Sequence, residues 1–176
     1  MERKKMLITG FFFTFIIGTL MHFTYHWTGC SAITGLFVPV NESMWEHLKM
    51  LAIPMLLFGL FEKRGYAKEL KNFWPARLLS IVSGMVILVL FYDLWLVVAG
   101  DGGLTLDIID FVVGVALAWV INGKLLASGR FASKTARTLA AVGIAALLAI
   151  FFVFTWQPPQ VDFFRDPPTG TFGPVK

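Results

Sequence analysis

The chain has 176 residues, of which 57% are hydrophobic and only 15% are charged. Its mean hydropathy of +0.73 is too high for a water-soluble domain, in which about half of the residues are apolar. The sequence therefore predicts an integral membrane protein, with room for about five spans of roughly 20 residues and no separate soluble domain.

The formal net charge is +4, but the basic residues stand in short loops between apolar runs and therefore indicate membrane topology. The sequence contains neither a phosphate-binding loop nor a dinucleotide motif, so no nucleotide or nucleic-acid partner is expected. The single cysteine, Cys30, has no second cysteine with which to form a disulfide or a thiolate metal site. Membrane lipids are the expected surroundings, and a homo-oligomer remains open.

The first span is predicted at about residues 6–26, behind the basic cluster at residues 3–5. This apolar run is longer than the core of a signal peptide, which has about 7 to 15 residues, and no small-residue cleavage site follows it. The run also ends in polar and aromatic side chains, at His22, Tyr25, His26 and Trp27. We therefore expect a helix that stays in the membrane.

The second span must include polar residues. The apolar run at 50–61 is too short to cross about 30 Å of hydrocarbon at roughly 1.5 Å per residue. The helix is therefore predicted at about residues 42–61, and it recruits the segment Asn41-Glu-Ser-Met-Trp-Glu-His-Leu-Lys49. Asn41 is the expected N-cap, and Pro54 is expected to kink the helix.

Three further spans are predicted at about residues 78–99, 105–123 and 138–155, separated by turn signals such as Gly100-Asp-Gly-Gly103. None of the runs alternates between apolar and polar residues as strands of a membrane barrel do. The predicted fold is thus all-α: residues 1–156 form a polytopic bundle of about five transmembrane helices.

Residues 157–176 form a Pro- and Gly-rich tail that is unlike a helix. The tail carries three phenylalanines, Phe163, Phe164 and Phe172. An apolar aromatic set in so short a segment indicates that the tail lies over the mouth of the bundle.

The orientation follows from the positions of lysine and arginine. With the N-terminus inside, the inner segments hold 12 of the 15 basic residues, at positions 3–5, 63–77 and 124–137. The outer loops at 27–40 and 100–106 hold none. Because cytoplasmic loops carry the excess of positive charge, the N-terminus is predicted inside and the C-terminal tail outside.

Ionisable residues of four spans fall at a similar depth below the outer face, when depth is counted at about 1.5 Å per residue. They are His22, Glu46, His47, Asp93 and Asp110. Such groups cost roughly 2.5 to 3.5 kcal/mol each inside a membrane, so they are expected to face one another in a single pocket. Lys49 is the one nearby cation and the predicted charge partner. The excess acids must therefore hold protons, bind a metal or turn towards water.

Histidine and carboxylate side chains together suit zinc, manganese or iron. The sequence thus predicts a divalent metal site, with Glu42 as a candidate catalytic base. Its candidate ligands are His22, His26, Glu46, His47, Asp93 and Asp110. The alternative is structural: the histidines bind backbone or carboxylate oxygens, and Glu46 forms an i, i+3 ion pair with Lys49.

Three functions fit this pattern. The first is a metal-dependent hydrolase of a lipid or lipid-linked substrate, the second a cation- or proton-coupled transport component, and the third a non-catalytic membrane partner. A transport pathway needs polar groups on the inner side, where the spans offer little beyond Ser80, Ser83 and Asn122. Glu62 and Asp101 are interpreted as solvated charges in loops. That scarcity favours a pocket open on one side.

Three segments resemble those of a family of small bacterial multi-spanning membrane proteins without an established activity. They are residues 22–27, the N-E-S-x-W-E-H-x-K motif at 41–49 and the D-P-x-T-G-type sequence at 166–173. The resemblance spans most of the chain. It implies a multi-pass protein of the bacterial cytoplasmic membrane and supports the helix layout, and it implies no cofactor or catalytic residue.

Overall fold

The computed structural model describes residues 2–100 and 103–175, and this part of the chain is helical, without a strand. Six α-helices and one 3-10 turn follow one another: α1 (Glu2–Trp27), α2 (Ala32–Gly35), α3 (Met44–Arg64), α4 (Phe73–Ala99), α5 (Leu104–Ser128), α6 (Lys134–Trp156) and η1 (Asp162–Phe164). Asp101, in the predicted turn between α4 and α5, and Lys176 lie outside the described residues.

Five of the helices are long and apolar enough to cross a membrane, as predicted: α1, α3, α4, α5 and α6. Several of these helices begin before or end after the apolar run that predicted them, because a membrane-spanning helix can extend beyond the hydrocarbon layer into the polar surroundings. Thus α4 begins at Phe73 instead of residue 78, and Pro75 occupies its first turn, where a missing N–H removes no helical hydrogen bond. Likewise Ser133 caps α6 by accepting a hydrogen bond from the N–H of Ala136 (3.1 Å).

The central helix is α3, which packs against α1 and α4. It has the lowest hydropathy of the five spans, yet 72% of its spanning stretch is buried, against 17% to 28% for the others. Three ionisable residues of α3, Glu46, Lys49 and Glu62, are buried and therefore face protein rather than lipid. Its start is not the predicted one: Ser43 caps the helix, and Asn41 lies outside it.

Helix α1 approaches α3 closely beside Pro54. Proline has no N–H, so the carbonyl of Met50, four residues earlier, lacks its usual helical donor. Gly18 of α1 packs against this carbonyl, and a Cβ added at Gly18 would lie 2.4 Å from Met50 O. The missing side chain thus allows the close contact.

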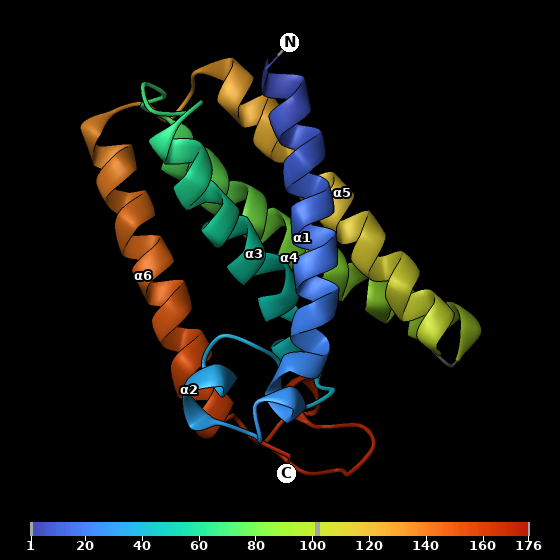
Figure 1. Ribbon diagram of the computed structural model, residues 1–176. Helices are drawn as coiled ribbons and strands as arrows, with labels where there is room; N and C mark the ends of the chain where they lie inside the picture. The colour runs from blue at the N-terminus through green and yellow to red at the C-terminus, as the bar shows by residue number, and fades with distance from the viewer. Residues whose placement is uncertain (1, 101–102, 176) are drawn as a thin grey trace.

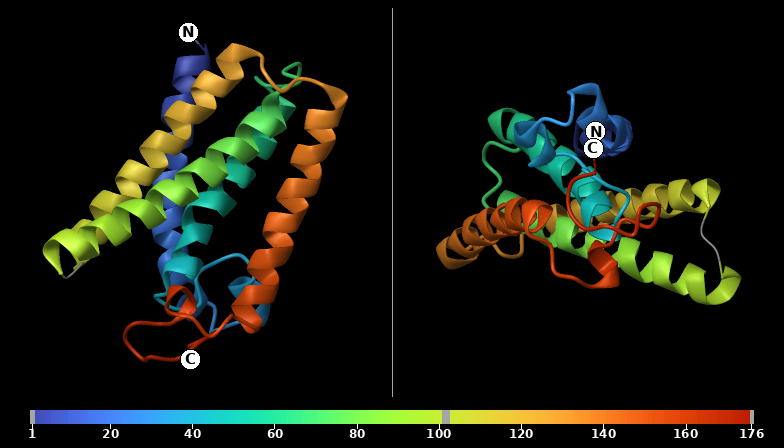
Figure 2. Two further views of the ribbon diagram at one scale, coloured as in Figure 1. Left: turned by 180° about the vertical axis from the view of Figure 1, so that it is seen from behind. Right: turned by 90° about the horizontal axis from the view of Figure 1, so that it is seen from below.

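Helices α4 and α5 form a hairpin. Its distance from the other helices increases along its length and is largest at the end where α4 and α5 are joined, as both views in Figure 2 show. They pack mainly on each other. Large apolar side chains near the turn are therefore exposed, including Val97 (84%), Val98 (72%) and Leu104 (76%). This exposure is favourable in a membrane, where lipid covers such side chains.

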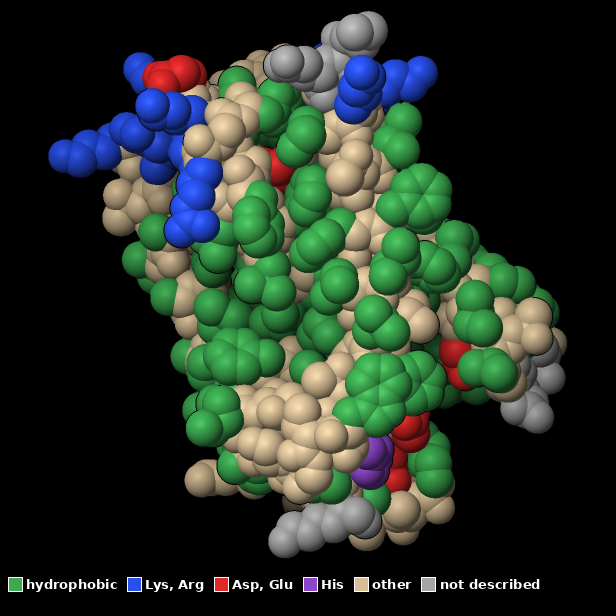
Figure 3. Space-filling view, in the orientation of Figure 1, with side chains coloured by type: hydrophobic (Ala, Val, Ile, Leu, Met, Phe, Trp, Pro, Cys, Tyr) green, Lys and Arg blue, Asp and Glu red, His purple; other side chains and the backbone are tan. Residues whose placement is uncertain are grey.

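The two ends of the bundle differ in charge. We name the end that carries the N-terminus and the loops at 65–72 and 129–133 the basic end, and the end that carries residues 28–43 and 157–175 the tail end (Figure 1). Lysine and arginine side chains gather at the basic end, whereas histidine and acidic side chains lie together near the tail end (Figure 3). The termini thus lie at opposite ends.

The C-terminal segment lies over the tail end, as the phenylalanines of the sequence predict. Trp45 of α3 is the centre of an aromatic cluster with Phe151 and Phe154 of α6 and with Phe163 and Phe164 of the tail, at ring-centroid distances of 5.0 to 6.2 Å. Aromatic pairs at such distances add stability beyond the buried area. The tail therefore has a fixed place on the bundle.

Candidate functional site

Three side chains from different segments meet at the tail end. His22 comes from the last two turns of α1, Glu42 from the loop before α3, and His47 from the first turn of α3. His22 Nε2 lies 3.5 Å from Glu42 Oε1, and His47 Nε2 lies 3.5 Å from Glu42 Oε2. The two imidazole rings stack with their centroids 5.4 Å apart. We name this group the His–Glu trio.

Ser43 determines how His47 is placed. Its hydroxyl accepts a hydrogen bond from the N–H of Glu46 (3.3 Å), and its carbonyl accepts one from the N–H of His47 (3.2 Å). The same carbonyl lies 2.9 Å from His47 Nδ1. Because a carbonyl only accepts hydrogen bonds, Nδ1 carries a proton, and in the neutral ring the lone pair belongs to Nε2. That lone pair faces the other two members of the trio.

The spacing of the trio fits a metal ion. Zinc binds histidine and carboxylate at about 2.0 to 2.1 Å in a tetrahedron, whose ligand atoms are therefore about 3.4 Å apart. Each His–Glu distance is 3.5 Å, measured to a different oxygen of Glu42. Each is close to this value and lies beyond the usual range of about 2.7 to 3.2 Å for an N–H···O hydrogen bond. All three ligand atoms lie within 4.8 Å of one another. A small contraction would place them around one ion.

The charges around the trio also favour a cation. When the histidines are protonated, a hydrogen bond from His47 and the charge on His22 hold the pKa of the Glu42 carboxyl below its ordinary value of 4.5, although partial burial acts in the opposite direction. The carboxylate of Asp107, on α5, is close enough to act electrostatically on both histidines. Glu42 is therefore ionised at neutral pH, beside a second acid.

The trio is open on one side. The side chains of His22, His47 and Glu42 are 27%, 33% and 46% exposed. A site built on three protein ligands with one face accessible is typical of catalytic metal centres, in which water or substrate takes the fourth position. A buried structural site would have four protein ligands.

Two of the six predicted ligands, His22 and His47, belong to the trio. No other group of three or more histidine, cysteine, aspartate and glutamate side chains in residues 2–100 and 103–175 has ligand atoms this close together. The third member, Glu42, is the residue that the sequence suggests as a base. It lies before the start of α3, so it does not share a helix face with Glu46 and instead reaches both histidines.

His26 and Asp93 lie apart from the trio. His26 is one turn beyond His22, and its Nδ1 lies 3.8 Å from Cys30 Sγ. Asp93 is exposed on α4, and the group of possible metal ligands found among the described residues does not include it. The predicted depth of these residues in the membrane is similar to that of the trio, but depth along a helix does not determine the direction in which a side chain points. They therefore do not join the trio.

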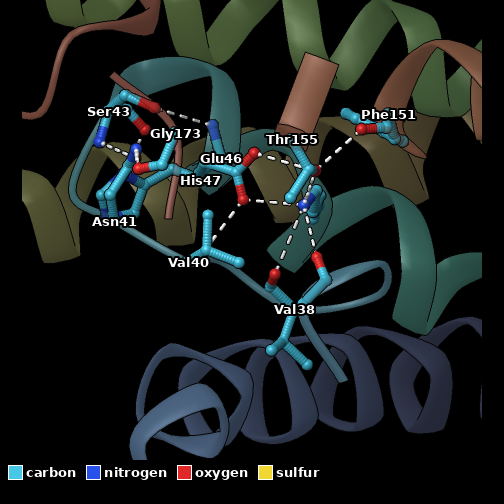
Figure 4. A network of polar contacts seen from close by, with 11 residues as sticks. Val38, Val40, Asn41, Ser43, Glu46, His47, Phe151, Thr155 and Gly173 are labelled. Atoms are coloured by element: carbon cyan, nitrogen blue, oxygen red, sulfur yellow. Dashed lines mark hydrogen bonds and ion pairs between the residues drawn. The ribbon is translucent and has the colours of Figure 1, made fainter. Parts of the chain in front are cut away.

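Glu46 points from the same turn of α3 into the protein, because successive residues of a helix are about 100° apart. Its Oε2 lies 2.7 Å from Lys49 Nζ and accepts a hydrogen bond from the N–H of Val40 (3.0 Å), and its Oε1 lies 3.2 Å from the Thr155 hydroxyl of α6 (Figure 4). Lys49 Nζ also donates to Thr155 Oγ1 (2.5 Å) and to the carbonyl of Gly35 (3.0 Å). We name this set the Glu46–Lys49 network.

Asp110 lies beside a different space. With Asp107 and Trp95 it lines a cavity of about 10 Å³ between α4 and α5. Asp110 Oδ1 and Trp95 Nε1 are buried and have no hydrogen-bond partner within the described part of the chain. A cavity of this volume with two polar groups can hold one water molecule.

A second buried ion pair lies towards the basic end and corrects the interpretation of Glu62 as a solvated loop charge. Glu62 of α3 and Arg77 of α4 pair with each other, and both side chains are fully buried. The Arg77 guanidinium also packs on the rings of Phe73 and Trp119, at 5.2 and 4.5 Å. Arg77 is thus an internal cation and contributes no surface charge.

The helical spacing of apolar residues in the sequence could have indicated that Glu62 is buried. Met55 and Phe58, seven and four residues earlier, are both buried. Residues at these spacings share one face of a helix. Glu62 therefore continues the buried face of α3, and its burial requires a nearby cation.

The comparisons with known proteins identify a family without indicating an activity. A family model described as "Family of unknown function (DUF6512)" matches residues 1–174. No curated protein and no solved structure matches the chain.

Proposed function

The chain belongs to the family of unknown function DUF6512, and from the geometry of its site we propose that it binds a divalent transition metal at the His–Glu trio and hydrolyses a lipid or lipid-linked substrate there. The five apolar helices support a membrane protein. We place it in the bacterial cytoplasmic membrane with the tail end outside, because the basic side chains gather at the opposite end.

The single observation that carries the proposal is the arrangement of ligand atoms in the trio. Two histidine Nε2 atoms each lie 3.5 Å from an oxygen of Glu42, and one ligand atom from each of the three residues lies within 4.8 Å of the other two, a grouping that could close around one ion. In addition, the hydrogen bond from His47 Nδ1 to the carbonyl of Ser43 is the kind of outer contact that fixes the tautomer of a metal-binding histidine. Zinc is the first expectation, and manganese and iron are the alternatives.

The open side of the trio indicates hydrolytic chemistry. A metal held by these three ligands would lower the pKa of a bound water to about 7 and so supply a nucleophile at neutral pH. The site lies near the tail end of the spans, which in the proposed topology is the outer side of the membrane. In this arrangement Glu42 is a ligand, and Asp107, whose charge acts on both histidines, takes over the role of base.

A second candidate, a cation- or proton-coupled transport component, is favoured by the Glu62–Arg77 pair. This pair supplies buried polar groups near the basic end, where the sequence suggested few. One observation argues against transport. The guanidinium of Arg77 is a fixed positive charge that packs on the rings of Phe73 and Trp119, and this charge repels an approaching cation. We therefore rank transport below hydrolysis.

Elemental analysis of the detergent-purified protein tests metal binding. We expect near-stoichiometric zinc, manganese or iron, which His47→Ala, His22→Ala and Glu42→Ala each reduce sharply. His26→Ala is the matched control, because His26 lies on the same helix as His22 and contacts Cys30; it should keep the metal. A lipid-hydrolysis screen of the loaded protein then tests the chemistry.

Two outcomes would reject the proposal. Well-folded protein could contain no metal, with a melting temperature unchanged by added zinc, manganese or iron. Alternatively, the trio variants could keep as much metal as the His26→Ala control. Either result would favour a purely structural histidine–glutamate contact.

A further inference from the structure

Glu42 stands on a segment without regular secondary structure. Residues 36–43 connect α2 to α3. The N–H of Val38 still donates to the carbonyl of Thr34, but none of the residues from 39 to 43 donates a helical hydrogen bond. A metal ligand on such a segment needs other contacts to hold it, because ligand positions must be kept to within about 0.5 Å. Those contacts come from the C-terminal tail.

The tail binds this segment at three successive points. The N–H of Val175 donates to the carbonyl of Val40 (3.2 Å), and Asn41 Nδ2 donates to the carbonyl of Gly173 (2.8 Å; Figure 4). The N–H of Glu42 itself donates to Asp166 Oδ1 (2.8 Å). More than 120 residues separate the partners, so these contacts depend on the complete fold.

Asp166 has no free oxygen for a metal. Its Oδ1 accepts from Glu42, and its Oδ2 accepts from the hydroxyl (2.6 Å) and the N–H (3.1 Å) of Thr169. Its side chain is buried, at 2% exposure. The two contacts with Thr169 therefore fix the carboxyl group in the orientation in which Oδ1 meets the N–H of Glu42.

The tail in turn has a fixed position relative to α3. Phe164, two residues before Asp166, is buried and lies 5.1 Å from the ring of Trp45. Trp45 belongs to the first turn of α3, as does His47. One rigid unit therefore places both Asp166 and one histidine of the trio.

From these contacts we infer that Asp166 is a positioning residue of the metal site and holds Glu42 at the distance at which it can bind the same ion as His22 and His47. This inference rests on the proposed metal binding. Asp166 does not touch the ion; it acts through the backbone N–H of Glu42. Outer contacts of this kind typically contribute about 10- to 100-fold to metal affinity.

The test measures the zinc dissociation constant of the full-length protein in detergent by competition with a chelator. We expect Asp166→Ala to weaken zinc binding by about tenfold or more. Asp166→Asn should lose less than Asp166→Ala, because its amide oxygen can still accept from the N–H of Glu42, although its amide nitrogen cannot accept from the N–H of Thr169. Asp162→Asn is the matched control in the same tail, since Asp162 is exposed and pairs with Arg165; its affinity should equal that of the wild type.

A double-mutant cycle separates positioning from general loosening of the fold. In a Glu42→Gln background, Asp166→Ala should cause little further loss of affinity, because Asp166 acts only through Glu42. An equal loss in both backgrounds, or an unchanged affinity in Asp166→Ala, would overturn the inference. If Asp166→Ala does not fold, Thr169→Val removes the 2.6 Å hydrogen bond to Oδ2 and serves in the same cycle.

The two proposals fail in different ways. Wild-type protein that binds no zinc rejects the metal site itself. Wild-type protein whose zinc binding depends on His47 but not on Asp166 rejects only the positioning role.

Discussion

Lys49 Nζ and Glu46 Oε2 lie 2.7 Å apart, three residues from each other on α3, and neither side chain reaches solvent. The ammonium group also donates to the carbonyls of Gly35 and Val38 and to the hydroxyl of Thr155. The pair therefore joins the connecting loop and α6 to the central helix. Each charge is therefore compensated by the other inside the protein.

Removing either charge alone should destabilise the protein strongly. Lys49→Ala or Glu46→Ala leaves the other charge buried without its partner, which typically costs about 3 to 5 kcal/mol. The double variant Glu46→Leu/Lys49→Met should recover much of this loss, because no charge is then buried. Thermal unfolding in detergent measures the effect, with the exposed Lys68→Ala as control. Single variants as stable as the control would contradict a buried pair.

A methyl group at Gly18 should separate α1 from α3. The new Cβ would lie 2.4 Å from the carbonyl of Met50, a backbone atom that cannot turn aside. Gly143→Ala is the matched control, because its Cβ would meet the flexible end of Leu78 and the change also improves helix propensity. We expect a lower melting temperature for Gly18→Ala and little change for Gly143→Ala. Equal melting temperatures would show that the close contact is not needed.

Acid should weaken the trio through Glu42. Its pKa in the folded protein is below the ordinary value of 4.5, so the folded state favours the ionised form. The resulting stabilisation is complete above about pH 4.5 and is lost as the pH falls through the lower folded pKa. Melting temperatures measured from pH 7 to 3 should fall less steeply in Glu42→Gln than in the wild type. Parallel curves would mean that Glu42 contributes nothing to the acid sensitivity.

The topology can be tested with single cysteines in a Cys30→Ser background. Ser128 lies at the basic end of α5, and Gln160 is exposed in the tail. In intact cells an impermeant maleimide should label a cysteine at position 160 and should label one at 128 only after the membrane is opened. The opposite pattern would place the tail end in the cytoplasm.

The sequence predicted the helices and the position of the tail well, because hydropathy and length decide what can cross a membrane. Phe163 and Phe164 similarly indicated that the tail packs on the bundle. The direction of each ionisable side chain was harder to predict. Glu46 and His47 have nearly the same depth, yet one enters the core and the other joins the trio.

Glu42 illustrates a second limit. Its role depends on where α3 begins, and both Asn41 and Ser43 are good N-caps by residue type. Asn41 Oδ1 instead accepts from the N–H of Ser43, and its amide group binds Gly173. Only the contact with the distant tail decides between the two caps, so sequence patterns near residue 42 could not show it.

The contacts between the tail and Glu42 also set an order of assembly. Asp166, Gly173 and Val175 are synthesised after all five spans, and they must reach the same side of the membrane as residues 40–43 before they can bind them. Until then the loop that carries Glu42 lacks its supports. The nascent chain would thus pass through the insertion machinery with an incomplete His–Glu trio, and under the proposed function the trio could bind a metal only after the last segment has folded back.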